Sequence, residues 1–263
     1  MTTLYAWARP LGIDDKLDHT WVTDFQPATK YSNITAVIAD KANLWFCWGD
    51  FHTNKMRSIG KDGANLALAQ CLVTPNDPNA HGTIFRYAID GVCHQLANQV
   101  LYSTTNKITV SNAHGYRLSH FLYGTYGTQK TAWAKKIASC TQIEAGPMDD
   151  FETYLRSMPD GSLTPDMIEA LLPLRADFQA ELQQLGQKVF DQNAAEGAAS
   201  INELISTFMT QAHKILGNEG FQAVFDTEMR ETFALVDPDM FAQSEVQLAK
   251  SLTAPSGQRD NDE

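Results

Sequence analysis

Hydrophobic and polar positions follow two different patterns along the chain. In the first half, short apolar stretches rich in β-branched and aromatic residues are separated by turn-forming residues, as is typical of β-strands. We expect strands at residues 19–25, 34–38, 44–48, 83–89 and 107–110. Helical spacing of Leu96, Val100 and Leu101 predicts one helix over 93–102, and a second short helix is expected over 65–72.

After residue 149 the pattern is that of capped helices. Thr164-Pro165-Asp166 is a helix start, with a capping hydroxyl, proline in the first turn and an acid behind it. The helix that follows carries an apolar stripe and is expected to kink near Pro173. A capping box at Ser200 to Glu203 opens another helix to about 216, Gly217 breaks it, and Asp237-Pro238 opens a last one.

These two patterns predict an α+β fold in two parts. Residues 1–145 would form a domain with an antiparallel sheet and one central helix, and residues 150–253 an α-helical bundle. The polar residues 254–263 read as a disordered tail. The bundle is expected to serve binding or assembly, including a homo-oligomer formed through it.

Composition and charge exclude several functional classes. The chain has 263 residues, of which 43% are hydrophobic, and its net charge is −11. Lysines and arginines are not clustered, so nucleic acid is not expected as a partner. No run of 18 apolar residues suits a membrane span, and the first ten residues lack the pattern of a secretory signal peptide. The expected location is therefore the cytoplasm.

The four cysteines all lie in the first 140 residues: Cys47, Cys71, Cys93 and Cys140. They form no CxxC pair and no zinc-like spacing with histidine, and so few cysteines in a chain this long do not suggest a disulfide framework. We expect one catalytic cysteine, with the others acting as small buried hydrophobic residues.

Cys93 is the best candidate for a nucleophile. A strand-like run ends at Asp90, Gly91 allows a sharp turn, and an amphipathic helix begins at Cys93. Unpaired N–H groups at a helix start favour the thiolate form and can also hold an oxyanion. The competing interpretation is a cysteine that merely packs there.

A catalytic thiol also needs a base and a group that orients the base. His19 is the preferred base, because it lies on a predicted strand that presents His19 and Trp21 on one face. Asp50, at the end of another aromatic-rich strand (residues 45–51), is the preferred orienting group. If the cysteine precedes the histidine in the chain, His114 would be the base instead. His94 follows Cys93 directly and points elsewhere on the helix.

Three short motifs resemble parts of the papain-like cysteine enzymes. Gly91-Val92-Cys93 resembles the nucleophile helix of the transglutaminase-like branch, His19-Thr20-Trp21-Val22 its histidine strand, and Trp48-Gly49-Asp50 the strand that ends in aspartate. The order His, Asp, Cys resembles that of circularly permuted relatives of the NlpC/P60 peptidases. The resemblance implies a Cys93–His19–Asp50 triad and a papain-like domain, although the interval from His19 to Asp50 is longer than in the family.

The leading hypothesis is a thiol-dependent acyl-transfer enzyme that acts on an amide bond as a peptidase, amidase or transamidase. Its partner would be a peptide or amide substrate, and it needs no cofactor or resident metal. One alternative is a non-enzymatic interaction protein on a degenerate papain-like scaffold. Another is a metal-assisted hydrolase that uses His19, the nearby acids Asp14, Asp15 and Asp18, and His52.

Overall fold

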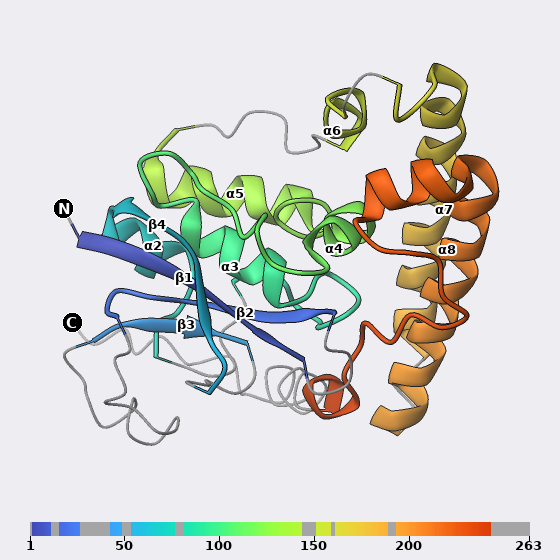
Figure 1. The fold of residues 1–263 in the computed structure, drawn as a ribbon. Coiled ribbons are helices and arrows are strands. Elements are labelled where there is room, and N and C mark those ends of the chain that lie inside the picture. The colour runs from blue at the N-terminus through green and yellow to red at the C-terminus, as the bar shows by residue number, and fades with distance from the viewer. Residues whose placement is uncertain are drawn as a thin grey trace.

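A four-stranded sheet with helices on one side, joined to a helical half, forms the architecture of this protein in a computed structural model (Figure 1). The structure describes residues 2–11, 16–26, 43–48, 54–76, 82–143, 151–158, 161–188 and 193–242. The predicted strand at 34–38, the boundary at 144–150 and the tail at 254–263 lie outside these residues.

The sheet is antiparallel throughout, as predicted. Its strands are β1 (Thr2–Pro10), β2 (Asp18–Thr23), β3 (Trp45–Cys47) and β4 (Arg57–Ala64), in the order β3-β2-β1-β4. The predicted strands at 19–25 and 44–48 correspond to β2 and β3. In contrast, β1 and β4 were not expected, because charged residues, proline and glycine dilute their apolar alternation.

Both faces of the sheet are buried along β2 and β3, whereas β4 has exposed residues. One face places Ala6, Val22 and Phe46 in the main hydrophobic core, which also contains Cys93. The opposite face forms a separate cluster of Trp7, Trp21, Trp45 and Cys47. Successive residues of a strand point to opposite faces, so each strand divides its side chains between the two clusters.

Helix α3 (Cys93–Leu101) packs on β2 and is buried along its whole length. It carries three buried amides on the side facing the loop after α4 (Tyr116–Tyr123). Each amide donates to a successive backbone carbonyl of that loop: Gln95 to Gly124 at 3.0 Å, Asn98 to Thr125 at 2.8 Å, and Gln99 to Tyr126 at 2.8 Å. These bonds satisfy polar groups that would otherwise be costly to bury, and they hold α3 in place.

A disulfide joins two helices of the first half, contrary to our expectation. Cys71 of α2 (Leu66–Leu72) is bonded to Cys140 of α5 (Lys130–Thr141), across 69 residues of sequence. Packing of α2 against α5 brings the two Cα atoms to 5.8 Å, within the range that a disulfide requires. The spacing of the cysteines along the chain does not predict this contact. Cys47 and Cys93 are free and buried.

The second half is helical, as its caps predicted. It consists of α6 (Phe151–Arg156), α7 (Pro165–Lys188) and α8 (Ala194–Phe225), followed by a short helical turn at 238–242. Asn193 caps the start of helix α8, because its side-chain oxygen accepts the Glu196 N–H. The helix therefore begins earlier than the capping box expected at Ser200. Gly217 interrupts α8 with φ 64°, as expected. No helix among the described residues is long and apolar enough to cross a membrane.

The two halves share one hydrophobic core rather than forming separate cores. Phe121 of α4 contacts Phe151 of α6 at 4.8 Å and Phe225 of α8 at 4.7 Å between ring centroids. Arg175 of α7 is buried and donates from Nε to the Phe121 carbonyl. The predicted strands at 83–89 and 107–110 are instead irregular segments beside α3. Ile84, Tyr87, Ile89 and Val110 are buried there without joining the sheet, whereas Phe85 is exposed.

Candidate functional site

Cys93 is the first residue of α3, and residues 86–92 form a tight turn directly before it. Ala88 takes the left-handed conformation, with φ 66°, and its N–H donates to the Gly91 carbonyl at 2.8 Å. A Cβ at Gly91 would lie 3.1 Å from the Gln95 Cβ, so glycine permits close packing of the turn on α3. Such a left-handed alanine is uncommon, and unusual backbone of this kind is often found at functional sites.

The Cys93 side chain points at the start of β2. It is 4% exposed, and its Sγ donates to the Asp18 carbonyl at 3.8 Å. Burial raises the pKa of the Cys93 thiol to about 11, although hydrogen bonds from Thr20 and the His94 backbone lower it. The thiol is therefore protonated at neutral pH in this conformation, despite its position at a helix start.

His19 does not meet Cys93, because the two residues lie on opposite faces of β2. Asp18 and Thr20 face α3, whereas His19 faces away and stacks on Trp21, with 5.6 Å between ring centroids. The predicted sharing of a face by His19 and Trp21 is thus confirmed. On that face, Nε2 of His19 is 3.5 Å from Sγ of Cys47, and both residues are buried. The structure does not bring together the expected pair of Cys93 and His19.

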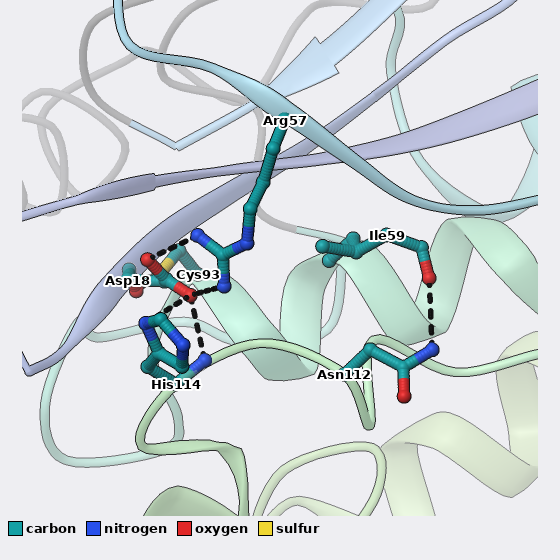
Figure 2. A network of polar contacts seen from close by, with 6 residues as sticks. All are labelled: Asp18, Arg57, Ile59, Cys93, Asn112 and His114. Carbon is teal, nitrogen blue, oxygen red and sulfur yellow. Dashed lines mark hydrogen bonds and ion pairs between the residues drawn. The ribbon is translucent and has the colours of Figure 1, made fainter.

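Asp18 is the centre of the polar network beside Cys93 (Figure 2). Its carboxylate is completely buried and accepts two bonds from the Arg57 guanidinium, one of them at 2.9 Å from Nη1. It also accepts the His114 backbone N–H at 2.6 Å, and it lies 3.6 Å from Nδ1 of the His114 ring. The Arg57 pKa is raised, mainly by its hydrogen bonds to Asp18. One buried carboxylate therefore ties β2, β4 and the loop before α4 together.

His114 connects this network to an open cavity. Its side chain is 60% exposed, while its loop is held to β4 by a bond of 3.2 Å from Asn112 Nδ2 to the Ile59 carbonyl (Figure 2). A cavity of about 390 Å³ has His114 in its wall. Leu17, Leu118 and Phe225 supply apolar lining, and the charged lining residues are Lys16, Asp226, Glu228 and Arg230.

His94 is a buried neutral histidine rather than a base. Its Nδ1 is 2.7 Å from the Ser119 hydroxyl of α4. Burial lowers the pKa of His94 to about 4, although the Asp18 charge raises it. A group with so low a pKa carries no proton at neutral pH and would be a weak base in catalysis.

The remaining candidates cannot be placed. Asp50, His52, Asp14 and Asp15 lie outside the described residues, so the role of Asp50 stays a prediction. Among the residues that the structure does describe, no group of three His, Cys, Asp or Glu side chains could hold a metal ion.

Sequence analysis named Asp18 only among the acids of a possible metal site, and it did not name Arg57. Strand alternation does put Asp18 on the face opposite His19 and Trp21. The sequence does not show which face of β2 is covered by the helix that begins at Cys93. Arg57 had no such signal, since its strand was not expected.

No protein-family model, curated protein or solved structure matches this chain. The papain-like resemblance therefore rests on its three short motifs. The antiparallel sheet and the helix that starts at Cys93 are compatible with it, but they also occur in other folds.

Proposed function

We propose that this protein is a thiol-dependent acyl-transfer enzyme that acts on an amide bond, with Cys93 as the nucleophile. The base in this proposal is His114, which sequence analysis held as the alternative to His19, and Asp18 takes the orienting role. The observation that carries the proposal is the convergence of three groups: Cys93 and His114 both contact Asp18, and His114 borders the cavity.

The proposed chemistry needs each of these groups. Sγ of Cys93 attacks the carbonyl carbon of the amide while Nε2 of His114 accepts the thiol proton, and backbone N–H groups at the start of α3 receive the oxyanion. Collapse of the tetrahedral intermediate breaks the C–N bond, and protonated His114 returns the proton to the departing amine. Water or a second amine then cleaves the thioester and regenerates the thiol. Asp18 holds Nδ1 of His114, so that Nε2 is the basic nitrogen.

The high pKa of Cys93 makes a base essential. With a pKa of about 11, only about one thiol in ten thousand is ionised at pH 7. A free thiolate is thus too rare for fast turnover, and the proton has to leave as the sulfur attacks. This differs from a pre-formed thiolate–imidazolium pair.

The test combines thiol labelling with turnover. Iodoacetamide alkylation of Cys93 and Cys47, followed separately by peptide mass mapping, would be compared in the unmodified protein and in His114→Ala. Release of amine or ammonia would be measured on a panel of peptide and glutaminyl amides. We expect Cys93→Ala to abolish turnover and His114→Ala to reduce it at least 100-fold. His213→Ala is the matched control, because His213 is a partly exposed histidine on α8 whose Nε2 lies 2.7 Å from Asn218 Oδ1. Full turnover in Cys93→Ala would overturn the proposal.

The burial of Cys93 favours a second candidate, a non-enzymatic interaction protein on this scaffold. In that case Cys93 and Cys47 would be packing residues, as inert buried cysteines usually are. Slow and equal alkylation of both thiols, together with no turnover on any amide, would favour this candidate. Assembly of a homo-oligomer through α7 and α8 remains a prediction in either case.

A further inference from the structure

His19 and Cys47 form a second thiol–imidazole pair, on the face of the sheet opposite Cys93. Nε2 of His19 lies 3.5 Å from Sγ of Cys47, which is within hydrogen-bonding distance for sulfur. His19 is 2% exposed and Cys47 is 0% exposed. The acyl-transfer mechanism uses neither residue, so the pair is a nucleophile and a base that stand outside that mechanism.

The register of the sheet brings these two side chains together. Strands β2 and β3 are antiparallel, and Trp21 of β2 is directly opposite Cys47 of β3. His19 precedes Trp21 by two residues, so it lies on the same face and is a diagonal neighbour of Cys47. The imidazole also stacks on Trp21, with 5.6 Å between ring centroids. Strand pairing and ring stacking therefore both fix the imidazole beside the sulfur.

Aromatic side chains enclose the pair and limit which molecules can reach it. The cluster around Cys47 is separate from the main core and contains Trp7, Trp21 and Trp45, with Tyr5, Phe25 and Met56 packed against it as partly buried residues. A charged reagent would lose its hydration in such surroundings, which is costly. A small uncharged molecule can enter when the partly buried side chains move aside in a local opening.

Cys47 is also isolated from the other three cysteines. Cys71 and Cys140 are joined in a disulfide, and Cys93 lies in the main core on the opposite face of the sheet. No other thiol of the chain can therefore reach Cys47 while the sheet is intact. Oxidation of Cys47 by one equivalent of oxidant thus ends at a sulfenic acid rather than at a disulfide within the chain.

We propose that Cys47 is a peroxide-reactive thiol, which hydrogen peroxide converts to a sulfenic acid with His19 as the base. Sγ attacks one oxygen of the peroxide, so that an S–O bond forms and the O–O bond breaks. Nε2 of His19 accepts the thiol proton and passes it to the departing hydroxide, which leaves as water. The sulfur loses two electrons and the peroxide gains them. This reaction does not depend on the acyl-transfer function proposed for Cys93.

The test is oxidation of the full chain at neutral pH by a small molar excess of hydrogen peroxide. Catalase stops the reaction, dimedone then traps sulfenic acid as the protein is denatured, and peptide mass mapping follows each cysteine separately. Cys93 is the internal comparison, because it is also free and buried but donates to the Asp18 carbonyl. Cys47 should gain the label at least about 10-fold faster than Cys93. Equal rates, or faster labelling of Cys93, would overturn the proposal.

His19→Gln tests the role of the base. Glutamine is polar but cannot take the thiol proton, so the labelling rate at Cys47 should fall at least about 10-fold. His94→Gln is the matched control, because His94 is also 2% exposed but follows Cys93 in α3, and the rate at Cys47 should not change. A His19→Gln variant that keeps its circular dichroism spectrum and the full rate would rule out His19 as the base. The comparison of Cys47 with Cys93 needs no variant, so it decides the proposal even if His19→Gln does not fold.

Discussion

Asp18 and His114 are joined by a reciprocal pair of hydrogen bonds. The Asp18 N–H donates to the His114 carbonyl at 3.1 Å, and the His114 N–H donates to the Asp18 carboxylate at 2.6 Å. These bonds connect residues that are 96 positions apart and place the His114 ring next to the buried carboxylate. The backbone of His114 is therefore fixed, while its exposed ring can reach the cavity.

Asp18→Asn should destabilise the fold, because it leaves the Arg57 guanidinium without its charged partner. We expect a loss of about 2–3 kcal/mol in the free energy of unfolding, measured by urea denaturation. Glu152→Gln is the control: it removes an exposed ion pair with Arg156 and should cost less than about 0.5 kcal/mol. Equal effects of the two substitutions would contradict a central role for Asp18.

Stability should fall as the pH is lowered from about 6.5 to about 4. His94 has a pKa of 6.5 when unfolded and about 4 when folded, so the unfolded chain binds the proton first. The stabilisation from neutral His94 is complete above pH 6.5 and is lost through this window, to an extent on the order of 3 kcal/mol. Thermal unfolding at each pH checks this.

His94→Gln isolates this contribution, because glutamine does not titrate in the window. The variant should show a flatter profile between pH 6.5 and 4 than the unmodified protein. His213→Gln, at a partly exposed histidine of α8, is the control for the loss of a histidine elsewhere in the protein. If His94→Gln keeps the full slope, other groups are responsible for the acid sensitivity.

Reduction of the Cys71–Cys140 disulfide should destabilise the protein. The bond closes a loop of 69 residues, for which chain entropy gives a contribution of about 4 kcal/mol. Urea denaturation with and without a reductant measures it, and Cys71→Ser combined with Cys140→Ser should lose the same amount but no longer respond to the reductant.

The disulfide also bears on where the protein works. Structural disulfides are rare in reducing compartments, so the redox state of Cys71 and Cys140 in the cell tests the expected cytoplasmic location. Protein isolated from its native cells with thiols trapped by alkylation should carry no label at Cys71 or Cys140. Labelling of all four cysteines would support the cytoplasm.

The two halves should unfold together, because Phe121 anchors a core that they share. Phe121→Ala removes a ring that contacts α6 and α8 and should cost about 3–5 kcal/mol, with a single transition in calorimetry. Phe85→Ala, at a phenylalanine that is 47% exposed, should cost far less. Two separate transitions in the unmodified protein would instead support independent domains.

Local patterns in the sequence placed several of the helices well, although α4 and α5 were not expected. Period and caps place α2, α3 and α7 close to their observed bounds, and Gly217 breaks α8 where glycine is expected to do so. Cys93 begins α3 as predicted. These features depend on neighbouring residues, whose spacing the sequence displays directly. Helix α7 continues through Pro173, where a kink was expected, and it buries residues on both sides of the proline, such as Leu171 and Arg175.

Only the tertiary structure decided which groups meet Cys93. Alternation along β2 shows that Asp18 and His19 point to opposite faces, but it does not say which face α3 covers. In many antiparallel sheets a polar face marks the side exposed to solvent, and the opposite face is the one that a helix covers. Both faces of β2 are buried, one by α3 and the other within a tryptophan cluster, so its sequence does not distinguish them. The Cys71–Cys140 bond and the Asp18–His114 pairing likewise join residues far apart in the chain. Packing of whole elements brings them together, and no local pattern records it.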